Sequence, residues 1–149
     1  MQILKTHFHS EVTTLENKSV FTRLATRSIA TQDENILLLY TARYEDYSLP
    51  GGGLESNENK ITGMIRELSE ETGAQNVRNI KPFGAYEEYR PWYKQEYDIQ
   101  HMIWYCYTCE IDKELGIAKM ESYETKNGMR PLWVNIHEAI EHNSNTIAS

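Results

Sequence analysis

Residues 50–53, read as "PGGG", constrain the fold more than any other short segment of the chain. Pro50 lacks a backbone N–H, and the glycines after it disfavour a helix while they permit positive φ angles and close approach of another backbone. The apolar strand pattern "ILLLYTAR" comes shortly before this segment, and a helical pattern follows it. The chain therefore has to pass from strand to helix through a glycine loop.

The helical pattern covers residues 57–72 and has one apolar face. The residues that share its narrow apolar arc are Ile61, Ile65, Leu68 and Thr72. A period of about 100° per residue places them together, so we expect this face to pack on a core. Ser56 or Asn57 is suited to cap the start of the helix, and Gly73 is suited to end it in the left-handed conformation.

The same helix carries Glu67, Glu70 and Glu71 on adjoining turns, away from the apolar arc. Like charges three or four residues apart destabilise a helix by about 0.2–0.5 kcal/mol per pair. We therefore expect positive charge from outside the chain, and a hard divalent cation such as Mg²⁺ suits carboxylate ligands and phosphate substrates. The glycine loop at the positive end of the helix dipole adds backbone groups that can approach a phosphate. Loop and helix form one candidate site.

Strand patterns dominate the rest of the chain. Residues 19–31 and 36–43 predict a hairpin, and residues 77–92 and 97–111 predict an antiparallel pair joined by the region from Pro91 to Glu96. A polar loop over residues 112–131, a short strand over 132–136 and a helix from His137 that frays complete the order. Because no linker or repeat divides residues 1–149, we predict a single domain of the α/β or α+β class, with a mixed sheet and helices on its faces.

Composition limits the partners. The formal net charge of −7 offers no basic field for a nucleic acid polymer. No apolar run reaches the roughly 20 residues needed to span a membrane, and the N-terminus lacks a signal core of about 7–15 apolar residues, so we expect a cytoplasmic protein. Cys106 and Cys109 lie in a strand pattern that points them to opposite faces, which argues against a shared metal or disulfide. His7 and His9 have no third ligand nearby.

The spacing of the glycine loop and the helix forms a longer motif. It consists of Gly52, five residues, Glu58, seven residues and then Arg66-Glu67-Leu68-Ser69-Glu70-Glu71-Thr72-Gly73-Ala74. This pattern resembles the signature of the Nudix hydrolase family, G-x5-E-x7-R-E-U-x-E-E-x-G-U, where U is a bulky aliphatic residue. Only Ala74 departs from it, at a position that affects packing after the helix. The resemblance implies an α/β/α sandwich with a mixed central sheet.

The resemblance also implies an activity and a set of roles. The reaction is Mg²⁺-dependent hydrolysis of a diphosphate bond in a nucleoside diphosphate linked to another moiety, with Mn²⁺ as an alternative metal. Nucleotides, nucleotide sugars and ADP-ribose-like compounds remain open as substrates. The resemblance makes Glu70 and Glu71 the principal metal ligands and the Gly51 carbonyl a further ligand. It gives Glu67 the role of ligand or proton acceptor. Arg66 corresponds to the residue that holds the glutamates, and Glu58 to an orienting residue.

Other site residues are predicted from their position. Family members often add an acidic residue from a late loop, and here we favour Glu124, with Glu121 second and Glu114 as a further candidate. Arg43 and Gly52 are candidate phosphate contacts. The aromatic candidates for a base contact are Tyr44, Tyr47, Tyr86, Tyr89, Trp92, Tyr93 and Tyr97, with Tyr89 assigned to the substrate. A homodimer and a nucleotide sensor with little turnover remain open alternatives, while a purely structural acidic helix is disfavoured by the complete signature.

Overall fold

The computed structural model of the protein describes residues 1–94 and 96–148. Its strands are β1 (Ile3–Phe8), β2 (Val20–Gln32), β3 (Asn35–Thr41), β4 (Asp46–Ser48), β5 (Gly51–Gly53), β6 (Arg78–Pro91), β7 (Ile99–Glu110) and β8 (Met129–Asn135). Its helices are α1 (Lys60–Thr72), α2 (Ser122–Lys126) and α3 (Ile136–Ala148). None of the helices within these described ranges is long and apolar enough to cross a membrane.

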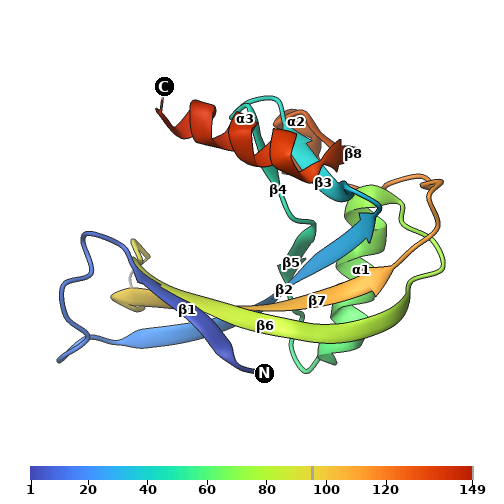
Figure 1. Ribbon diagram of the computed structural model, residues 1–149. Helices are drawn as coiled ribbons and strands as arrows, with labels where there is room; N and C mark the ends of the chain where they lie inside the picture. The colour runs from blue at the N-terminus through green and yellow to red at the C-terminus, as the bar shows by residue number, and fades with distance from the viewer. Residues whose placement is uncertain (95, 149) are drawn as a thin grey trace.

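The strands form a mixed sheet. Its order is β1-β6-β7-β2-β3-β4, with β5 paired to β2 and β8 paired to β3. The pairs β1–β6 and β2–β7 are parallel, whereas β6–β7 and β3–β8 are antiparallel. Figure 1 shows β1, β6, β7 and β2 as one curved layer, with β3, β4 and β8 above it. The predicted mixed α/β class is confirmed.

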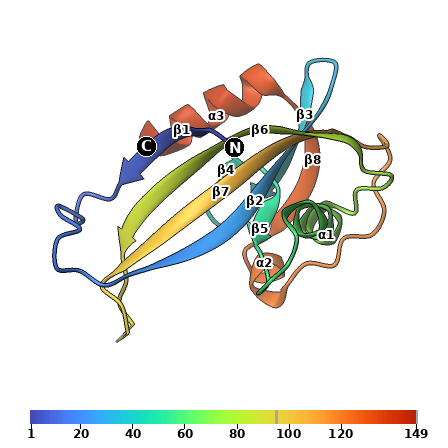
Figure 2. The same ribbon diagram turned by 90° about the horizontal axis from the view of Figure 1, so that it is seen from below.

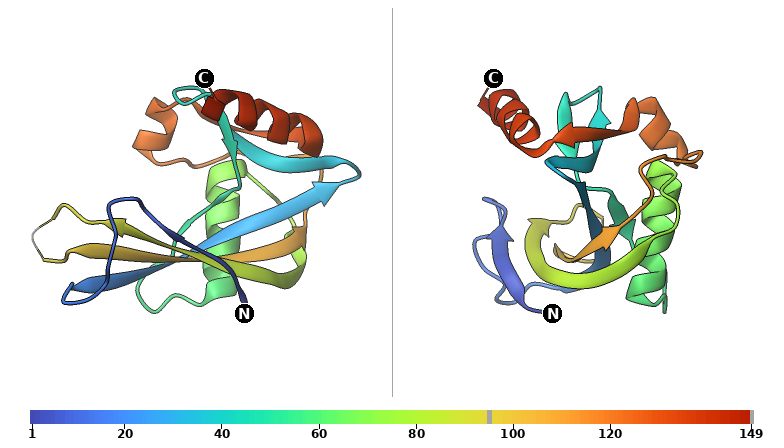
Figure 3. Two further views of the ribbon diagram at one scale, coloured as in Figure 1. Left: turned by 60° about the vertical axis from the view of Figure 1, so that its left-hand side comes forward. Right: turned by 45° about the vertical axis from the view of Figure 1, so that its right-hand side comes forward.

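The helices lie on different parts of this sheet. Helix α1 packs against β2, β5 and β8, and α3 packs against β4 and β8. Seen from below, β5 lies beside β2 and α1 lies next to β5, at one side of the curved layer. Helix α2 lies on the same side of the molecule (Figure 2). The further views in Figure 3 place α3 next to β3, β4 and β8, away from β6 and β7. This arrangement brings the glycine segment, α1 and α2 close to one another.

Helix α1 begins at Lys60, three residues later than the sequence pattern predicts. Asn59 caps it, because its side-chain oxygen accepts hydrogen bonds from the N–H groups of Ile61 at 2.9 Å and Thr62 at 3.2 Å. Asn57 instead has a φ of 62° in the preceding turn, so the predicted cap at Ser56 or Asn57 is wrong. The predicted end is confirmed, since Gly73 has a φ of 74° and its N–H bonds the Ser69 carbonyl at 2.9 Å.

The predicted buried face of α1 is confirmed at Leu68 and Thr72, but the buried face as a whole is rotated toward Met64. Met64 and Leu68 are fully buried in the main apolar cluster with Leu37 of β3, whereas Ile61 is 37% exposed. The buried residues of α1 come from its middle and its end, and Ile61 in the first turn does not pack against the main apolar cluster. The same rotation turns Glu71 inward, where its exposed fraction falls to 4%.

The predicted hairpins differ in extent. The antiparallel pair β6–β7 is confirmed over almost the full length of both strands, although Gln95 in its predicted connection lies outside the described residues. The β2–β3 pair is antiparallel but covers only the end of β2, most of which pairs with β7 and β5. The polar loop contains the short helix α2, and α3 continues to Ala148 rather than fraying early.

Candidate active site

A cavity of about 420 Å³ lies where β5, α1, α2 and the curved layer meet. Its lining combines glycine backbone, acidic and basic side chains and aromatic rings. The lining residues are Arg23, Arg27, Leu39, Ser48, Gly51, Gly52, Gly53, Glu71, Arg90, Gln100, Met102, Trp104, Tyr123, Glu124 and Met129. The two segments that the sequence singles out, the glycine loop and the acidic helix, therefore contribute to one cavity.

The glycine segment forms a short strand because β2 holds it. Gly51, Gly52 and Gly53 pair with the run from Ala25 to Arg27 in antiparallel register. A Cβ atom on Gly52 would lie 2.6 Å from a carboxylate oxygen of Glu67, a distance that requires the side chain to move. Glycine at this position thus lets the Glu67 carboxylate pack directly against the strand.

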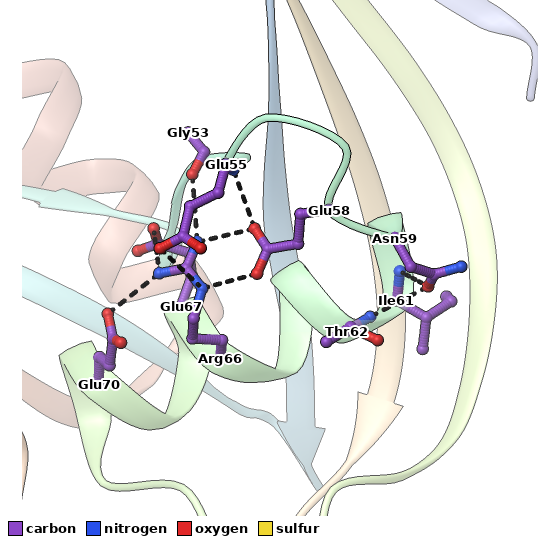
Figure 4. A network of polar contacts seen from close by, with 9 residues as sticks. All are labelled: Gly53, Glu55, Glu58, Asn59, Ile61, Thr62, Arg66, Glu67 and Glu70. Carbon is purple, nitrogen blue, oxygen red and sulfur yellow. Dashed lines mark hydrogen bonds and ion pairs between the residues drawn. The ribbon is translucent and has the colours of Figure 1, made fainter.

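Arg66 is the centre of an ion-pair network on one side of α1 (Figure 4). Its Nε and Nη2 donate to the two carboxylate oxygens of Glu58 at 2.8 and 2.9 Å. Its Nη1 donates to Glu67 at 3.1 Å and to Glu70 at 3.2 Å. The chain itself therefore supplies positive charge to two of the three helix glutamates, which corrects the expectation that the compensation comes wholly from outside.

This network fixes the protonation of Glu58. The hydrogen bonds from Arg66, together with the backbone N–H of Glu55 at 3.0 Å, lower the Glu58 pKa from 4.5 to about 2. In return, the hydrogen-bonded carboxylate raises the pKa of Arg66 above its usual value. Glu58 is thus charged at neutral pH and holds the guanidinium through two hydrogen bonds, and its orienting role in the site stays a prediction.

Glu71 has the opposite environment. Burial, followed by the nearby charges of Glu124 and Glu67, raises the Glu71 pKa from 4.5 to about 9. The Glu71 carboxyl also donates a hydrogen bond to Glu67, whose own pKa is raised by burial and lowered in part by Arg66. In the absence of a cation, Glu71 is therefore held in its protonated form at neutral pH.

Among the glutamates of the late loop, Glu124 is the one that lines the cavity. It lies in α2 with an exposed fraction of 6%, and its carboxylate accepts the Glu121 N–H at 3.0 Å in a capping box. Glu121 and Glu114 are exposed. The position favoured from the sequence thus lies beside Glu71, and its role there stays a prediction.

The other predicted metal ligands do not all line the cavity. Gly51 lines the cavity, but its carbonyl accepts a hydrogen bond from Arg27 at 3.3 Å. Glu67 lies behind Gly52, whereas the Glu70 side chain is 40% exposed, is ion-paired with Arg66 and does not line the cavity. Within residues 1–94 and 96–148, no group of three or more His, Cys, Asp or Glu side chains is arranged to hold a metal ion.

The kind of ligand nevertheless fits a hard cation. Glu71 and Glu124 present carboxylate oxygens to one cavity, Glu67 is hydrogen-bonded to Glu71, and burial keeps water from screening their repulsion. Mg²⁺ prefers oxygen ligands and needs only one or two carboxylates when a phosphate supplies others. Burial, Glu124 and Glu67 raise the Glu71 pKa more than the charge of Arg27 lowers it, which is an environment that favours a further positive charge.

Two predicted substrate residues lie outside the cavity. Arg43 donates to the Asn127 side chain at 3.1 Å, and its guanidinium lies over the ring of Tyr44. Tyr89 stacks between Phe8 and His101 at centroid distances of 4.8 and 4.3 Å. Because successive strand residues point to opposite faces, the cavity receives its neighbour Arg90 instead.

Three arginines and a tryptophan that the sequence reasoning did not select complete the cavity. Arg27 donates to the Leu49 carbonyl at 3.0 Å and lies 4.0 Å from the centre of the Trp104 ring. Arg23 and Arg90 lie farther along the same face. The alternation of "RLATR" in β2 does place Arg23 and Arg27 on one face, but only the pairing of β2 with β7 shows which face that is.

The comparisons with known proteins agree with this fold. A NUDIX domain family model matches residues 22–148. A NUDIX hydrolase from Nitrosomonas europaea superimposes with a TM-score of 0.63 at 19% identity, covering 83% of this chain and 79% of the other. A MutT protein from Bacillus halodurans gives a TM-score of 0.62 at 23% identity, covering 80% and 72%. A MutT NUDIX hydrolase from Burkholderia pseudomallei gives 0.57 at 16% identity, covering 78% and 85%.

The family match extends over most of the chain, from the second strand to the last helix. The protein therefore belongs to the NUDIX family. Membership supports a hydrolase that acts on pyrophosphate bonds. The solved structures establish the shared fold, and no curated protein gives a significant match to the chain.

Proposed function

We propose that the protein hydrolyses a diphosphate bond in a nucleoside diphosphate linked to another group, with Mg²⁺ as cofactor and Mn²⁺ as an alternative. One observation carries this proposal: the buried carboxyl groups of Glu71 and Glu124 face a glycine strand and three arginines in a single cavity. Acidic groups suited to a cation therefore lie within reach of cationic groups suited to phosphate oxygens.

In this proposal Glu71 and Glu124 would hold the cation, Glu70 and the Gly51 carbonyl would be further ligands, and Glu67 would be either a ligand or the proton acceptor. When bound, the cation neutralises charge on the phosphoryl oxygens. Arg66 keeps Glu67 in place through its contact at 3.1 Å, and Glu58 in turn fixes Arg66 through two hydrogen bonds. These contacts act as a support for the ligands, because a carboxylate with a fixed orientation needs less reorganisation when it binds.

The remaining groups act on the substrate. The guanidinium groups of Arg23, Arg27 and Arg90 bind phosphate oxygens, and the exposed backbone of Gly52 permits close approach of the phosphate. Glu67, whose pKa is raised, accepts a proton from the attacking water, with Glu124 as the second candidate. Water adds across the P–O–P bridge, so one P–O bond forms and one breaks. The products are a nucleoside monophosphate and a phosphorylated second group.

A panel of nucleoside polyphosphates, nucleotide sugars, ADP-ribose and dinucleoside polyphosphates tests the proposal. We expect product release with Mg²⁺ or Mn²⁺ from at least one compound, complete loss with a chelator, and a reduction of at least about 10²-fold in Glu70→Gln or Glu124→Gln. Glu114→Gln, which changes an exposed glutamate of the same loop, is the matched control and retains full activity.

Two outcomes would reject the proposal. Full turnover in the presence of a chelator would remove the metal from the reaction. Tight nucleotide binding without turnover of any compound in the panel would instead favour the alternative function, a nucleotide sensor with a NUDIX fold.

A further inference from the structure

Three successive carbonyl groups at the start of β5 are held by two neighbouring residues of β2. Arg27 Nη1 donates to the Leu49 carbonyl at 3.0 Å and to the Gly51 carbonyl at 3.3 Å. The N–H of Ser28 donates to the Pro50 carbonyl between them at 2.9 Å. The guanidinium of Arg27 therefore lies on the backbone of the glycine segment, at the wall of the cavity.

Gly51 is packed so closely against β2 that its carbonyl has little freedom to move away. Gly51 pairs with Arg27 in the antiparallel β2–β5 ladder, and a Cβ atom on Gly51 would lie 1.9 Å from the carbonyl oxygen of Thr26. Only glycine fits this contact. Because the backbone is fixed in this way, the Gly51 carbonyl loses its guanidinium partner only if the Arg27 side chain moves.

Trp104 of β7 holds the same guanidinium. The Arg27 Cζ lies 4.0 Å from the centre of the Trp104 ring, which is the distance of a cation–π contact. The ring is itself held, because its Nε1 donates to Glu88 at 3.0 Å and the Tyr86 ring is stacked on it at 6.0 Å between centres. Contacts with the glycine segment and with β7 thus fix the position of Arg27.

The charge of Arg27 is not neutralised by a direct ion pair. Arg66 is paired with several carboxylates, whereas Arg27 forms no ion pair with any residue of the described ranges. The charge of Arg27 lowers the Glu71 pKa, although burial and the neighbouring carboxyl groups raise that pKa more. In the metal-free protein, Arg27 is therefore a positive group that acts on the buried Glu71 carboxyl.

The Gly51 carbonyl has two competing partners when a cation binds in the cavity. It is a predicted metal ligand, yet its oxygen already accepts a hydrogen bond from Arg27. A guanidinium and a divalent cation on one oxygen repel each other, and the repulsion is strong where little water screens it. The proposed cation site also includes Glu71, on which the charge of Arg27 acts. Binding of the cation to the whole site therefore requires Arg27 to leave the carbonyl.

We propose that Arg27 competes with the cation for the Gly51 carbonyl: it holds this oxygen in the metal-free protein and releases it when a divalent cation binds. Trp104 is the positioning residue that keeps Arg27 over the glycine segment until then. The released guanidinium is free to bind a phosphate oxygen. The inference rests on the proposed function for the place of the cation, and it adds a movement of Arg27 that couples the binding of the cation to that of the phosphate.

Titration of the full chain with Mn²⁺ alone, without nucleotide, tests the competition independently of turnover. Electron paramagnetic resonance measures the free ion. We expect Arg27→Met to bind Mn²⁺ at least about tenfold more tightly than the wild-type protein, because the repulsion and the competing hydrogen bond are both lost. Loss of Arg27 also favours the proton on Glu71, but the cation carries two charges and the displaced proton only one. Arg27→Gln replaces Arg27→Met if that variant does not fold.

Replacement of Trp104 tests its positioning role. Trp104→Leu removes the aromatic face and should tighten Mn²⁺ binding by about threefold, whereas Trp104→Phe keeps a face and should restore the wild-type affinity. A general loss of structure in Trp104→Leu would weaken binding instead, and either weaker or unchanged binding would overturn this role. In the wild-type protein, Mg²⁺ should change the tryptophan emission as Arg27 leaves the Trp104 ring, and this change should be absent in Arg27→Met.

Arg23→Met is the matched control, because it removes the same charge from the same strand and cavity without a contact to the Leu49 or Gly51 carbonyl. It should change Mn²⁺ affinity by less than about twofold. Addition of Glu71→Gln to Arg27→Met should remove the gain in affinity, because the ion then lacks a ligand in the cavity. A gain that persists in this double variant would place the ion elsewhere and overturn the inference.

Four further outcomes separate the inference from the proposed function. Mn²⁺ affinity in Arg27→Met that equals or falls below the wild-type value would overturn the inference, as would an equal gain in Arg23→Met or unchanged tryptophan emission on addition of Mg²⁺. Tighter binding in Arg27→Met without hydrolysis of any compound in the panel would overturn the proposed function alone. Metal-dependent hydrolysis with equal Mn²⁺ affinities would overturn the inference alone.

Discussion

Two glutamates on different sides of α1 have pKa values that are shifted in opposite directions. Glu58 and Glu71 are both largely shielded, yet the pKa of Glu58 is lowered to about 2 while that of Glu71 is raised to about 9. The difference is the position of Arg66, which donates two hydrogen bonds to Glu58 and none to Glu71. Burial is the largest cause of the raised Glu71 pKa, whereas at Glu58 the hydrogen bonds from Arg66 outweigh the effect of burial.

This difference divides the acidic cluster into two parts. On the Arg66 side, Glu58, Glu67 and Glu70 have a partner within the chain. On the cavity side, Glu71 and Glu124 face each other with Arg27 as the nearest compensating charge. A cation from outside is needed on the cavity side, so experiments that separate the two parts test the proposed site.

The largest effect is expected for Glu71→Gln on activity. The change keeps the shape of the side chain but removes a ligand, so we expect kcat to fall by at least about 10²-fold on any substrate that the wild-type protein cleaves. Glu55→Gln is the control on the Arg66 side, since its exposed carboxylate lies 3.9 Å from Arg66, and it should retain full activity. Equal losses in the two variants would contradict the division into two parts.

The next largest effect is expected for replacement of Arg66, which should lower the stability of the fold. Arg66→Met leaves three carboxylates without their partner, so the midpoint of thermal unfolding should fall by several degrees. Arg66→Lys keeps the charge but not the two-pronged contact with Glu58, so its loss should be smaller yet clear. Addition of Glu58→Gln to Arg66→Met should cost less than the two single changes predict. Strict additivity would show that the contact with Glu58 contributes nothing.

The pH dependence of stability should differ between the two parts. Because the folded protein holds a proton on Glu71 up to about pH 9 and the unfolded chain releases it near pH 4.5, the metal-free protein should lose stability as pH rises through that interval. Glu71→Gln should flatten this slope. Glu58 has the opposite sign: its contribution is complete above about pH 4.5 and is lost as pH falls toward about 2. Denaturant titrations across this range measure both slopes, and an unchanged upper slope in Glu71→Gln would assign the proton elsewhere.

The smallest effect is expected at the helix cap, which belongs to neither part. Asn59→Ala removes two hydrogen bonds to the first turn of α1 and should cost about 1 kcal/mol in the free energy of unfolding. Asn59→Ser should restore most of this loss. Both variants should keep the two pH slopes of the wild-type protein. A change of slope in Asn59→Ala would mean that the cap and the carboxyl groups are coupled.

Local features were well predicted from the sequence. The end of α1 at Gly73 follows from the backbone freedom of glycine, and the β6–β7 pair follows from two adjacent strand patterns. The start of the helix was misplaced, because Ser56, Asn57 and Asn59 are all good caps and only the turn geometry selects Asn59. Ile61 was misplaced because a helical wheel gives the arc but not where the core ends.

The composition of the cavity depends on contacts between distant parts of the chain. Arg23 and Arg90 are 67 residues apart by their numbering in the sequence, and they share a face only because β7 pairs in parallel with β2 and antiparallel with β6. Sequence periodicity gives the alternation within each strand but not the register between strands. For the same reason the sequence does not show that Arg90, and not its neighbour Tyr89 on the opposite face, lines the cavity.

Gly52 has a consequence for how the motif tolerates change. An added methyl group at this position would occupy the space that the Glu67 carboxylate fills. Gly52→Ala changes no charge and removes no ligand, yet the added methyl group would displace the carboxylate of Glu67 in α1. The signature therefore depends on a missing side chain as well as on its acidic ones, because even one methyl group at position 52 would displace the Glu67 carboxylate.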